Sequence, residues 1–386
     1  MKLFKNVDLY TPEHLGKRDV LVEGEKIAKI AKSITEYDGI ADVEIFDLAG
    51  KVMVPGYIDN HVHITGGGGE QGPASRTPEA SIGVLLDCGV TTVIGLLGTD
   101  GITKSLPNLL AKARALNEEG ITCYILTGAY GYPPVTMTGS VEQDMVLIDL
   151  VIGVKTAAVD HRSSNPTGED LIALGTAARR GGMLSNCGGV VTIHMGSGKA
   201  LLEPLFYALE HSDIPPQIFL PTHMNVRSMD LIDAVVALTK LGGNMDYTVA
   251  GTMEENKDVA MQVAYALHEG MELEHLTCSS DGYGSMPRFN DKQECIGLTY
   301  VTPCGLHQLV QQLVALKILP LEQALTLVTS NPARVLGLGQ KKGQVAVGYD
   351  ADMLIYAADA AIESVIAKGR VAVWEGKHII KGRFEI

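Results

Sequence analysis

Residues 54–63 read Val-Pro-Gly-Tyr-Ile-Asp-Asn-His-Val-His and end in a pair of histidines two positions apart. The apolar residues that lead into the pair predict a β-strand. In a strand, residues i and i+2 point to the same face, so His61 and His63 would project together from one strand end. Two such imidazoles are suitable ligands for a divalent metal. A single His-x-His pair is weak evidence, because such pairs also occur on solvent-exposed strands, and the rest of the chain decides.

Composition narrows the class of protein. The 386 residues are 46% hydrophobic, enough for a large core in a globular protein. The formal net charge is −14, so we expect no nucleic-acid partner, which would need a basic surface. No run of 18 apolar residues occurs, and we expect neither a membrane span nor a signal peptide. Six cysteines without a C-x-x-C pair predict reduced, mostly buried thiols in a cytoplasmic protein.

The two ends of the chain share one character, which is short apolar strands separated by glycine-containing turns. They comprise residues 1–53 and 341–386, and each is too small to form a core by itself. Together they predict one small β-domain, and two separate sheet extensions are the alternative. The expected strands are Asp19–Glu23, Lys26–Ile30, Val43–Leu48, Ala351–Tyr356, Ser364–Ala367 and Arg370–Trp374.

Residues 54–340 alternate between β-type runs and helical patterns. Eight runs, most of them followed by a helix, predict a (β/α)8 TIM barrel, and a doubly wound open sheet is the runner-up. No G-x-G-x-x-G stretch follows the first run, which disfavours a dinucleotide site. The runs begin near Gly56, Thr91, Thr122, Asp149, Val190, Ile218, Asn244 and His275. The clearest helical patterns are Leu106–Glu119, Leu201–His211, Met229–Leu241 and Lys257–Glu269.

Residues of metal-ligating type end several of these runs. In a barrel the catalytic groups sit at the carboxyl ends of the strands, so the run ends should meet on one rim. A histidine after one apolar strand is more often a hydrogen-bonded core or loop residue. Several such ends on a common rim are harder to explain in that way. We therefore predict a metal site made of His61, His63, Lys155, His194, His223 and Asp281.

Lys155 is an unusual member of this set. A protonated lysine has three donors and no acceptor, so it cannot bind a cation. Burial beside cations depresses a lysine pKa and favours the neutral amine. A neutral amine can react with carbon dioxide to give a carbamate, whose two oxygens can bridge two metals. The alternative is a surface lysine at the start of a loop, which the apolar residues Val151, Ile152 and Val154 disfavour.

This arrangement resembles the binuclear-metal branch of the amidohydrolase superfamily, and the resemblance covers nearly the whole chain. It implies that His61, His63, Lys155 and Asp281 hold one zinc ion, and that Lys155, His194 and His223 hold the other. It also implies a carboxylated Lys155, a hydroxide that bridges the metals, and a small β-sandwich formed from both chain ends. Asp281 would then move a proton from the attacking hydroxide to the leaving amine.

Within the superfamily, longer stretches resemble the isoaspartyl (β-aspartyl) dipeptidases. The resemblance implies hydrolysis of the β-aspartyl bond in dipeptides, and a homo-oligomer that is octameric in that family. The matching stretches are Gly66-Gly67-Gly68-Gly69-Glu70, Gly95-Leu96-Leu97-Gly98-Thr99-Asp100, Leu126-Thr127-Gly128-Ala129-Tyr130, Ile152-Gly153-Val154-Lys155, Asp160-His161-Arg162-Ser163 and Ser279-Ser280-Asp281-Gly282-Tyr283-Gly284-Ser285.

The dipeptidase resemblance also implies substrate contacts. Tyr130 would donate to the developing oxyanion, Glu70 would pair with the substrate ammonium, and Arg162 would bind a carboxylate in a bidentate fork. Gly68 and Gly69 would let the backbone approach the ligand, and Thr99 and Ser285 would add hydrogen bonds. One departure concerns an arginine that the family places three residues after the sixth-strand histidine. Val226 occupies that position here, and Arg227 follows it.

Two other interpretations stay open. One is an amidohydrolase that opens cyclic amides, of the dihydroorotase or hydantoinase type, which the Gly-Gly-Gly-Gly-Glu and Asp-His-Arg-Ser stretches disfavour. The other is a non-catalytic assembly protein that keeps the barrel. Loss of metal ligands would be its signature, and all six expected ligands are present.

Overall fold

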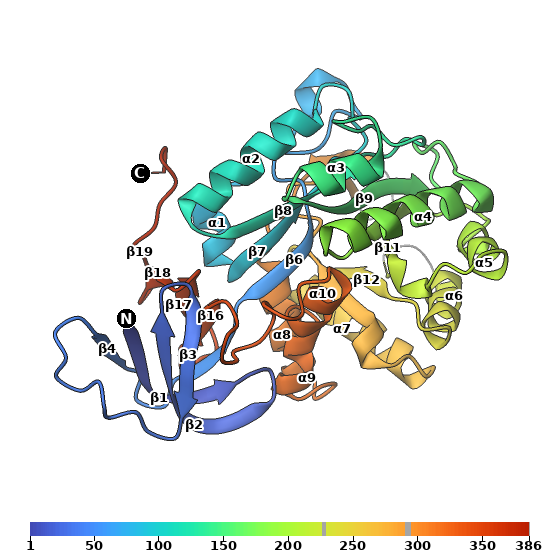
Figure 1. Ribbon diagram of the computed structural model, residues 1–386. Coiled ribbons are helices and arrows are strands. Elements are labelled where there is room, and N and C mark those ends of the chain that lie inside the picture. The colour runs from blue at the N-terminus through green and yellow to red at the C-terminus, as the bar shows by residue number, and fades with distance from the viewer. Residues whose placement is uncertain (226–228, 290–294, 386) are drawn as a thin grey trace.

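The computed structural model describes residues 1–225, 229–289 and 295–385 (Figure 1). Its middle portion is a mixed α/β fold with eight parallel strands that succeed one another along the chain. These strands are β6 (Tyr57–Val62), β7 (Val90–Gly95), β8 (Thr122–Gly128), β9 (Val151–Ala158), β10 (Val190–Met195), β11 (Phe219–Thr222), β12 (Met245–Thr248) and β13 (Leu276–Ser279).

The eight strands fall into two hydrogen-bonded groups. Strands β6 to β11 form a curled six-stranded sheet in chain order, and β12 pairs with β13. Hydrogen bonds bring the pair to both edges of the larger sheet. The amide of His63 donates to the carbonyl of Gly282 at 2.9 Å, and the amide of Met224 donates to the carbonyl of Asp246 at 3.3 Å. The C-terminal ends of all eight strands thus lie around one rim.

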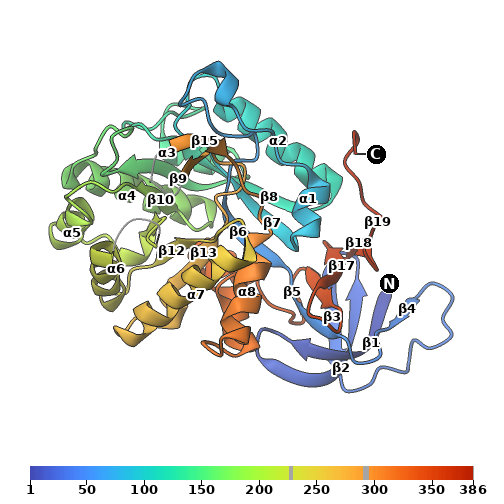
Figure 2. The same ribbon diagram turned by 180° about the vertical axis from the view of Figure 1, so that it is seen from behind.

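Helices surround the outside of this sheet (Figures 1 and 2). The sequence predicted α2 with the bounds that the structure has. α7 begins four residues before its predicted start, because the side chain of Thr252 caps its first turn by accepting from the amide of Glu255. The helices are α1 (Ile82–Asp87), α2 (Leu106–Glu119), α3 (Val141–Leu147), α4 (Gly168–Ser185), α5 (Glu203–Glu210), α6 (Met229–Lys240), α7 (Met253–His268), α8 (Gly305–Ala315), α9 (Leu321–Thr326) and α10 (Ser330–Val335).

Strands from both chain ends form a single nine-stranded sheet at one side of the molecule. In Figure 1 the blue N-terminal strands lie beside the red C-terminal ones. Antiparallel pairing of β5 with β16 joins the two ends, and β4 pairs with β1 outside the main strand order. The strands are β1 (Lys2–Tyr10), β2 (His14–Glu23), β3 (Lys26–Ala31), β4 (Glu44–Asp47), β5 (Val52–Pro55), β16 (Met353–Tyr356), β17 (Ile362–Ala367), β18 (Arg370–Trp374) and β19 (Lys377–His378).

Two local features differ from the sequence expectation. Cys88 and Cys304 form a disulfide, so the expectation of six reduced thiols is wrong for this pair. The two residues are 216 positions apart, and only the packing of their segments brings the Cα atoms to 4.2 Å. The second feature is an antiparallel pair, β14 (Met286–Phe289) and β15 (Cys295–Thr299), which the sequence did not predict.

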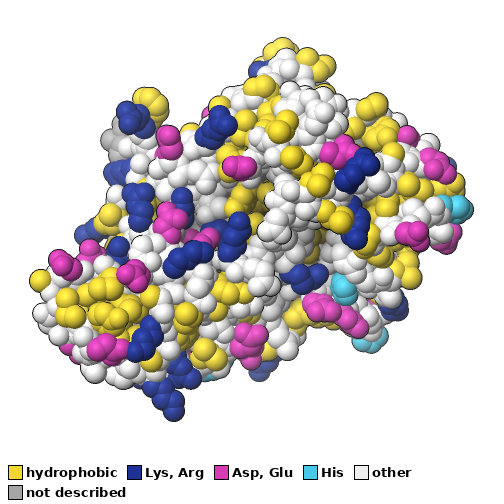
Figure 3. All heavy atoms as spheres, viewed as in Figure 1, with side chains coloured by type: hydrophobic (Ala, Val, Ile, Leu, Met, Phe, Trp, Pro, Cys, Tyr) yellow, Lys and Arg dark blue, Asp and Glu magenta, His cyan; other side chains and the backbone are white. Residues whose placement is uncertain are grey.

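The outer surface mixes both signs of charge. On the face drawn in Figure 3, acidic and basic side chains are interspersed over the terminal sheet and the α/β portion. The net charge of −14 is therefore not gathered into one patch on this face. Among the described residues, no helix is both long enough and apolar enough to cross a membrane.

A buried ion cluster connects the terminal sheet to the middle portion. The ammonium of Lys342 lies 2.8 Å from an Asp350 oxygen and 2.5 Å from an Asp352 oxygen, and it donates to the Thr122 hydroxyl at 2.7 Å. Burial opposes the charge of Lys342, but the two carboxylates outweigh it and raise the lysine pKa. Thr122 begins β8, so this one side chain fixes the terminal segment against the strand start.

We expect Lys342→Met to lower the free energy of unfolding by about 3–5 kcal/mol, because it leaves two carboxylates without their buried partner. Equilibrium urea unfolding at pH 7 measures the change. The matched control is Lys341→Met, whose lysine is exposed and donates to the Tyr124 hydroxyl. The difference between wild type and Lys342→Met should shrink at acid pH. Asp350 has a lowered pKa in the fold, so its contribution is present above its unfolded pKa and is lost as the pH falls.

Candidate metal centre

The structure brings all six predicted ligands together at the C-terminal rim of the strands. Five of them are buried, and the side chain of Asp281 is only 17% exposed. Two strand ends differ from the prediction. β9 continues to Ala158, so Lys155 lies within the strand rather than at its end, and β13 stops at Ser279, two residues before Asp281. Both side chains still face the cluster, because the ammonium of Lys155 lies 3.1 Å from Nε2 of His61, and Asp281 approaches the same nitrogen at 3.5 Å.

Three of the six groups surround one point. Nε2 of His63 lies 3.1 Å from a carboxylate oxygen of Asp281, and Nε2 of His61 lies 3.5 Å from the same oxygen. The potential ligand atoms of these three residues are all within 4.8 Å of one another. Two imidazoles and a carboxylate that converge in this way form a suitable divalent-metal site.

The other two histidines come from β10, which contains His194, and from the end of β11, which His223 follows. The ring centroid of His223 is 5.0 Å from that of His61 and 4.6 Å from that of His194. Nδ1 of His223 is held at 2.7 Å from the hydroxyl of Thr248. Because that contact uses Nδ1, Nε2 is the nitrogen through which His223 would bind a metal.

Burial sets the protonation of the cluster. Desolvation lowers the pKa of Lys155 from its usual value to about 7, although Asp281 and Asp246 oppose the shift. Desolvation, with the charge of Lys155, also lowers the pKa of His61 well below its usual value. For Asp281 burial acts in the opposite sense, but the charge of His223 and the hydrogen bond to His63 hold its pKa at about 2. Near neutral pH the cluster therefore offers a neutral His61 imidazole, an amine at Lys155 that can lose its proton, and the carboxylate of Asp281.

This donor set fits divalent cations. Four buried imidazoles and an amine would repel one another if they were all protonated, and the single carboxylate could balance only one of those charges. Neutral imidazole and carboxylate together suit zinc and similar ions. In both His61 and His63, Nε2 is the nitrogen that approaches Asp281. Their Nδ1 atoms are buried and have no hydrogen-bond partner in the described part of the chain.

Six of the eight predicted substrate-facing residues line a cavity of about 490 Å³ beside the cluster, and a seventh, Gly69, lines a smaller neighbouring cavity. The lining of the first cavity includes His63, His194, His223 and Asp281 together with Gly68, Glu70, Thr99, Tyr130, Arg162 and Ser285. The hydroxyl of Ser285 donates to Glu70 at 2.8 Å. The hydroxyl of Tyr130 lies 2.8 Å from Nδ1 of His194, directly at the cluster.

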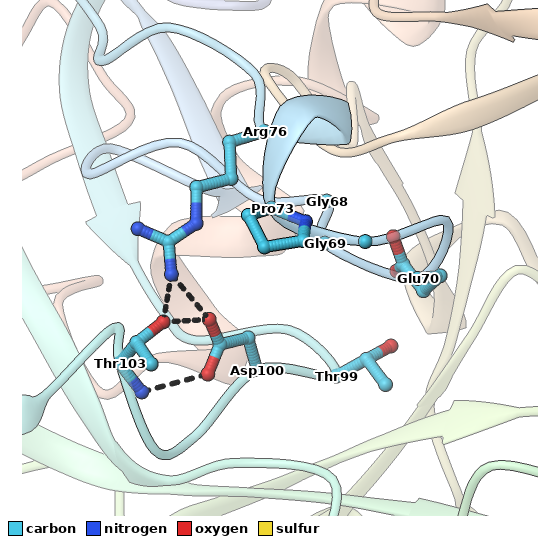
Figure 4. A pocket seen from close by; sticks show the side chains of 9 residues that line it. Gly68, Gly69, Glu70, Pro73, Arg76, Thr99, Asp100 and Thr103 are labelled. Carbon is cyan, nitrogen blue, oxygen red and sulfur yellow. Dashed lines mark hydrogen bonds and ion pairs between the residues drawn. The ribbon is translucent and has the colours of Figure 1, made fainter.

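A smaller cavity of about 270 Å³ adjoins the first at the glycine-rich loop (Figure 4). Figure 4 shows Glu70 and Thr99 at one side of it. Arg76 lies at the other side, 3.3 Å from Asp100, and also contacts Thr103. Gly68, with a φ of +82°, comes so close to this segment that a Cβ would lie 2.2 Å from the carbonyl oxygen of Ser75. The loop therefore requires glycine there.

Comparisons with known proteins agree with this architecture. The amidohydrolase family model matches residues 226–372. The β-aspartyl dipeptidase of Fervidobacterium islandicum AW-1, solved in complex with the dipeptide β-Asp-Leu, is 41% identical with a TM-score of 0.90, and the match covers 100% of both chains.

The chain belongs to the β-aspartyl dipeptidase family of the amidohydrolases. More distant proteins share either the fold at low sequence identity or a short similar segment. Enamidase has a TM-score of 0.67 at 20% identity over 99% of this chain and 97% of its own, which shows the same fold. Dihydroorotase of Staphylococcus aureus (strain Mu50) is 30% identical over 118 residues, and that segment spans 31% of this chain and only 26% of the dihydroorotase.

The sequence did not predict Thr248, which contacts His223, or Asp160, which contacts His194. Asp160 is buried, and its Oδ2 lies 3.0 Å from Nε2 of His194. Its two carboxylate oxygens also accept hydrogen bonds from Nε and Nη2 of Arg162, each at 2.9 Å. The hydrogen bonds from His194 and Arg162 lower the carboxylate pKa against the opposing effect of burial. The only signal for Asp160 in the sequence was its place at the head of the Asp-His-Arg-Ser stretch, and the contact depends on the neighbouring strand.

Two predicted substrate contacts, Arg162 and Arg227, are not shown ready to bind a ligand. The guanidinium of Arg162, expected to bind a substrate carboxylate, is occupied by Asp160 in this structure, with Nη1 3.9 Å from Glu70. Arg227 and Val226 lie outside the described residues, so the departure from the family pattern after His223 stays a sequence observation.

We expect Lys155→Ala to bind less metal than the wild type, because the group proposed to bridge the two ions is lost. Metal content after reconstitution with zinc, measured by elemental analysis, checks this. Short carboxylates such as formate or acetate should restore part of the metal and part of the activity by replacing the carbamate. Lys112→Ala is the matched control, since Lys112 is partly exposed on α2 and pairs only loosely with Glu79 at 3.6 Å. Unchanged metal content in Lys155→Ala would remove this lysine from the site.

Proposed function

We propose that this chain is a metal-dependent hydrolase of β-aspartyl (isoaspartyl) dipeptides. The observation that carries the proposal is the full-length identity of 41% to a β-aspartyl dipeptidase, with a buried cluster of candidate ligands at the rim of the strands. Hydrogen bonds at both seams of the two sheets also support the inference that β6 to β13 close into one eight-stranded barrel.

The metal centre is proposed to hold two divalent ions, with zinc the best match to the donors. His61, His63, Lys155 and Asp281 would hold one ion, and Lys155, His194 and His223 the other. Lys155 would be carboxylated, a reaction that its pKa of about 7 supports because a neutral amine is then available. When bound, the ions supply an activated water at neutral pH and polarise the scissile carbonyl.

The chain's own groups would carry the proton and the developing charge. Asp281 has a pKa of about 2, so it is ionised and ready to accept a proton from the attacking water, then to give it to the leaving amine. The hydroxyl of Tyr130 lies 2.8 Å from Nδ1 of His194 and would donate to the oxyanion. Asp281 and Tyr130 both line the cavity in which the scissile carbonyl would lie.

The polar ends of a dipeptide have counter-charges in the same cavity. Glu70 would pair with the free ammonium, and its orientation is already set by the hydrogen bond from Ser285. Arg162, 5.4 Å above the Tyr130 ring, would face a carboxylate. A ligand carboxylate can bind the outer edge of the guanidinium, because Asp160 uses only Nε and Nη2.

A second function has specific support. The segment similar to dihydroorotase favours opening of a cyclic amide at the same metal centre. A cyclic amide lacks a free ammonium, so the Glu70–Ser285 pair would have no partner in it. We therefore rank the linear β-aspartyl substrate first.

One assay separates the candidates. Zinc-loaded protein is given β-Asp-Leu, the isomeric α-Asp-Leu, dihydroorotate and hydantoin in turn. We expect cleavage of β-Asp-Leu at a kcat/KM far above that of the other three. Opening of a cyclic amide without cleavage of β-Asp-Leu would overturn the proposal in favour of the second function.

Glu70→Gln tests the ammonium contact. The variant keeps the shape but loses the charge, and a hydrogen bond to a charged group contributes about 1.5–3 kcal/mol. We expect kcat/KM for β-Asp-Leu to fall about 10- to 100-fold, since about 1.4 kcal/mol is a factor of ten. Activity on N-acetylated β-Asp-Leu, which has no ammonium, should be low in both forms and should change little. Glu79→Gln, an exposed position, is the control. Equal kcat/KM for free and acetylated substrate in the wild type would contradict the role.

A further inference from the structure

We infer that Asp160 is a positioning residue that fixes the tautomer and orientation of His194, and that the same carboxylate holds Arg162 in place for the substrate. The inference rests on the proposed metal-dependent function. It assigns a role to a residue outside the six ligands, and it connects the metal side of the cavity with its substrate side.

The contact between Asp160 and His194 is a built feature of the fold. Asp160 follows β9 and His194 lies in β10, and the loops after the two strands approach closely. A Cβ at Gly196 would lie 2.6 Å from Cβ of Asp160 and 2.3 Å from the carbonyl oxygen of Val159. The missing side chain at Gly196 is therefore what admits Asp160 to the histidine.

The backbone before Asp160 is strained in the same place. Val159 has a φ of +57°, a left-handed conformation that β-branched residues rarely adopt. Such outliers persist only where the surroundings hold them, and they cluster at functional sites. Here the turn is held by the amides of Gly196 and Gly198, which donate to the carbonyls of Ala158 and Val159 at 3.0 Å each. The turn directs the Asp160 carboxylate toward β10.

The chemistry of the contact decides the tautomer. A carboxylate only accepts hydrogen bonds, so Nε2 of His194, 3.0 Å from Oδ2 of Asp160, must carry the hydrogen. A bare Nε2 would point its lone pair at the carboxylate oxygen. Arg162 Nη2 approaches the same Nε2 at 3.4 Å, but its bond to Asp160 is shorter at 2.9 Å.

The consequence appears at the other nitrogen of the ring. With hydrogen on Nε2, Nδ1 carries its lone pair on the side where the Tyr130 hydroxyl lies, 2.8 Å away. Because Asp160 uses Nε2, Nδ1 is the nitrogen that remains for a metal. Carboxylate partners of metal-binding histidines act in this way, and their loss typically costs about 10- to 100-fold in metal affinity.

Asp160 also fixes the guanidinium of Arg162. Three bonds join the two residues, from the backbone amide at 2.8 Å and from Nε and Nη2 at 2.9 Å each. Nη1 is left directed toward Glu70 at 3.9 Å. One carboxylate therefore sets both the histidine nitrogen that faces a metal and the arginine edge that faces a substrate.

The experiment compares Asp160→Asn with Asp160→Ala in the full chain. Asparagine keeps the shape, but its amide can donate to Nε2 and so favours the hydrogen on Nδ1. Alanine only removes the partner. Zinc affinity is measured by competition with a chromogenic chelator. It should fall about 10- to 100-fold in Asp160→Asn, and this loss should be equal to or larger than the loss in Asp160→Ala. A role in packing alone gives the opposite order, because alanine leaves the larger cavity.

Two further variants complete the test. Asp170→Asn loses the same charge at the capping box of α4, where the carboxylate accepts from the amide and the hydroxyl of Thr167, and should keep wild-type zinc affinity. Arg162→Met leaves the Asp160–His194 contact in place, so zinc affinity should stay close to wild type while kcat/KM for β-Asp-Leu falls. Wild-type zinc affinity in Asp160→Asn, or a larger loss in Asp160→Ala, overturns the inference. If Asp160→Asn does not fold, the test compares Arg162→Met with Asp160→Ala. Equal losses of zinc affinity in the two variants overturn the inference. A loss of zinc affinity in Asp160→Ala alone supports it.

The zinc titration needs no substrate, so it separates this inference from the proposed activity. A wild-type chain that binds zinc without cleaving β-Asp-Leu would refute the activity. The comparison of zinc affinities between the Asp160 variants would still stand.

Discussion

The arrangement of the rim depends on one fully buried carboxylate, that of Asp246 in β12. It accepts hydrogen bonds from side chains on three other strands, namely Asn60 at 3.0 Å, Thr222 at 2.7 Å, Thr277 at 2.6 Å and Ser279 at 2.5 Å. Burial raises its pKa although these bonds oppose the shift. An unsatisfied charge in this position would cost several kcal/mol, so all the partners must be in place together.

This requirement fixes the candidate ligands as well. Asn60 and Thr222 directly precede His61 and His223, and Ser279 precedes Asp281 by two residues. Because Asp246 holds β6, β11 and β13 in register with β12, the ligand-bearing ends of those strands cannot slide independently. A second buried carboxylate, Asp59, strengthens one seam by accepting from the amide and the hydroxyl of Ser280, next to Asp281. The cluster is thus positioned before any metal binds.

The sequence predicted what is local or periodic, and it did so well. The strand-helix alternation and the bounds of α2 follow from residue patterns, and the candidate ligands at the ends of the runs lie close together in the fold. It failed where packing decides. Asp160 meets His194 only because Gly196 lacks a side chain, and Cys88 meets Cys304 across 216 residues. His223 and Asp281 have φ values of +65° and +50°, which local propensity would assign to glycine. Such positions are held by the surrounding fold, so a single sequence gives no sign of them.

The candidate metal ligands and the candidate substrate contacts lie on different parts of the fold. The candidate ligands sit in or directly beside strands, whose mutual hydrogen bonds leave little freedom. Glu70, Thr99, Arg162 and Ser285 sit on loops after β6, β7, β9 and β13. Loop variation on a constant α/β scaffold is how one fold serves many substrates, and enamidase shares this fold at only 20% identity.

Yet the loop that bears Glu70 is not freely variable. A Cβ at Gly66 would lie 2.4 Å from the carbonyl oxygen of Thr77, and one at Gly68 would lie 2.2 Å from that of Ser75. Both glycines also have positive φ values, +74° and +82°, so a side chain at either position would strain the backbone as well as collide with it. Positions 66 and 68 can therefore accept a side chain only if the backbone between β6 and α1 takes a new path.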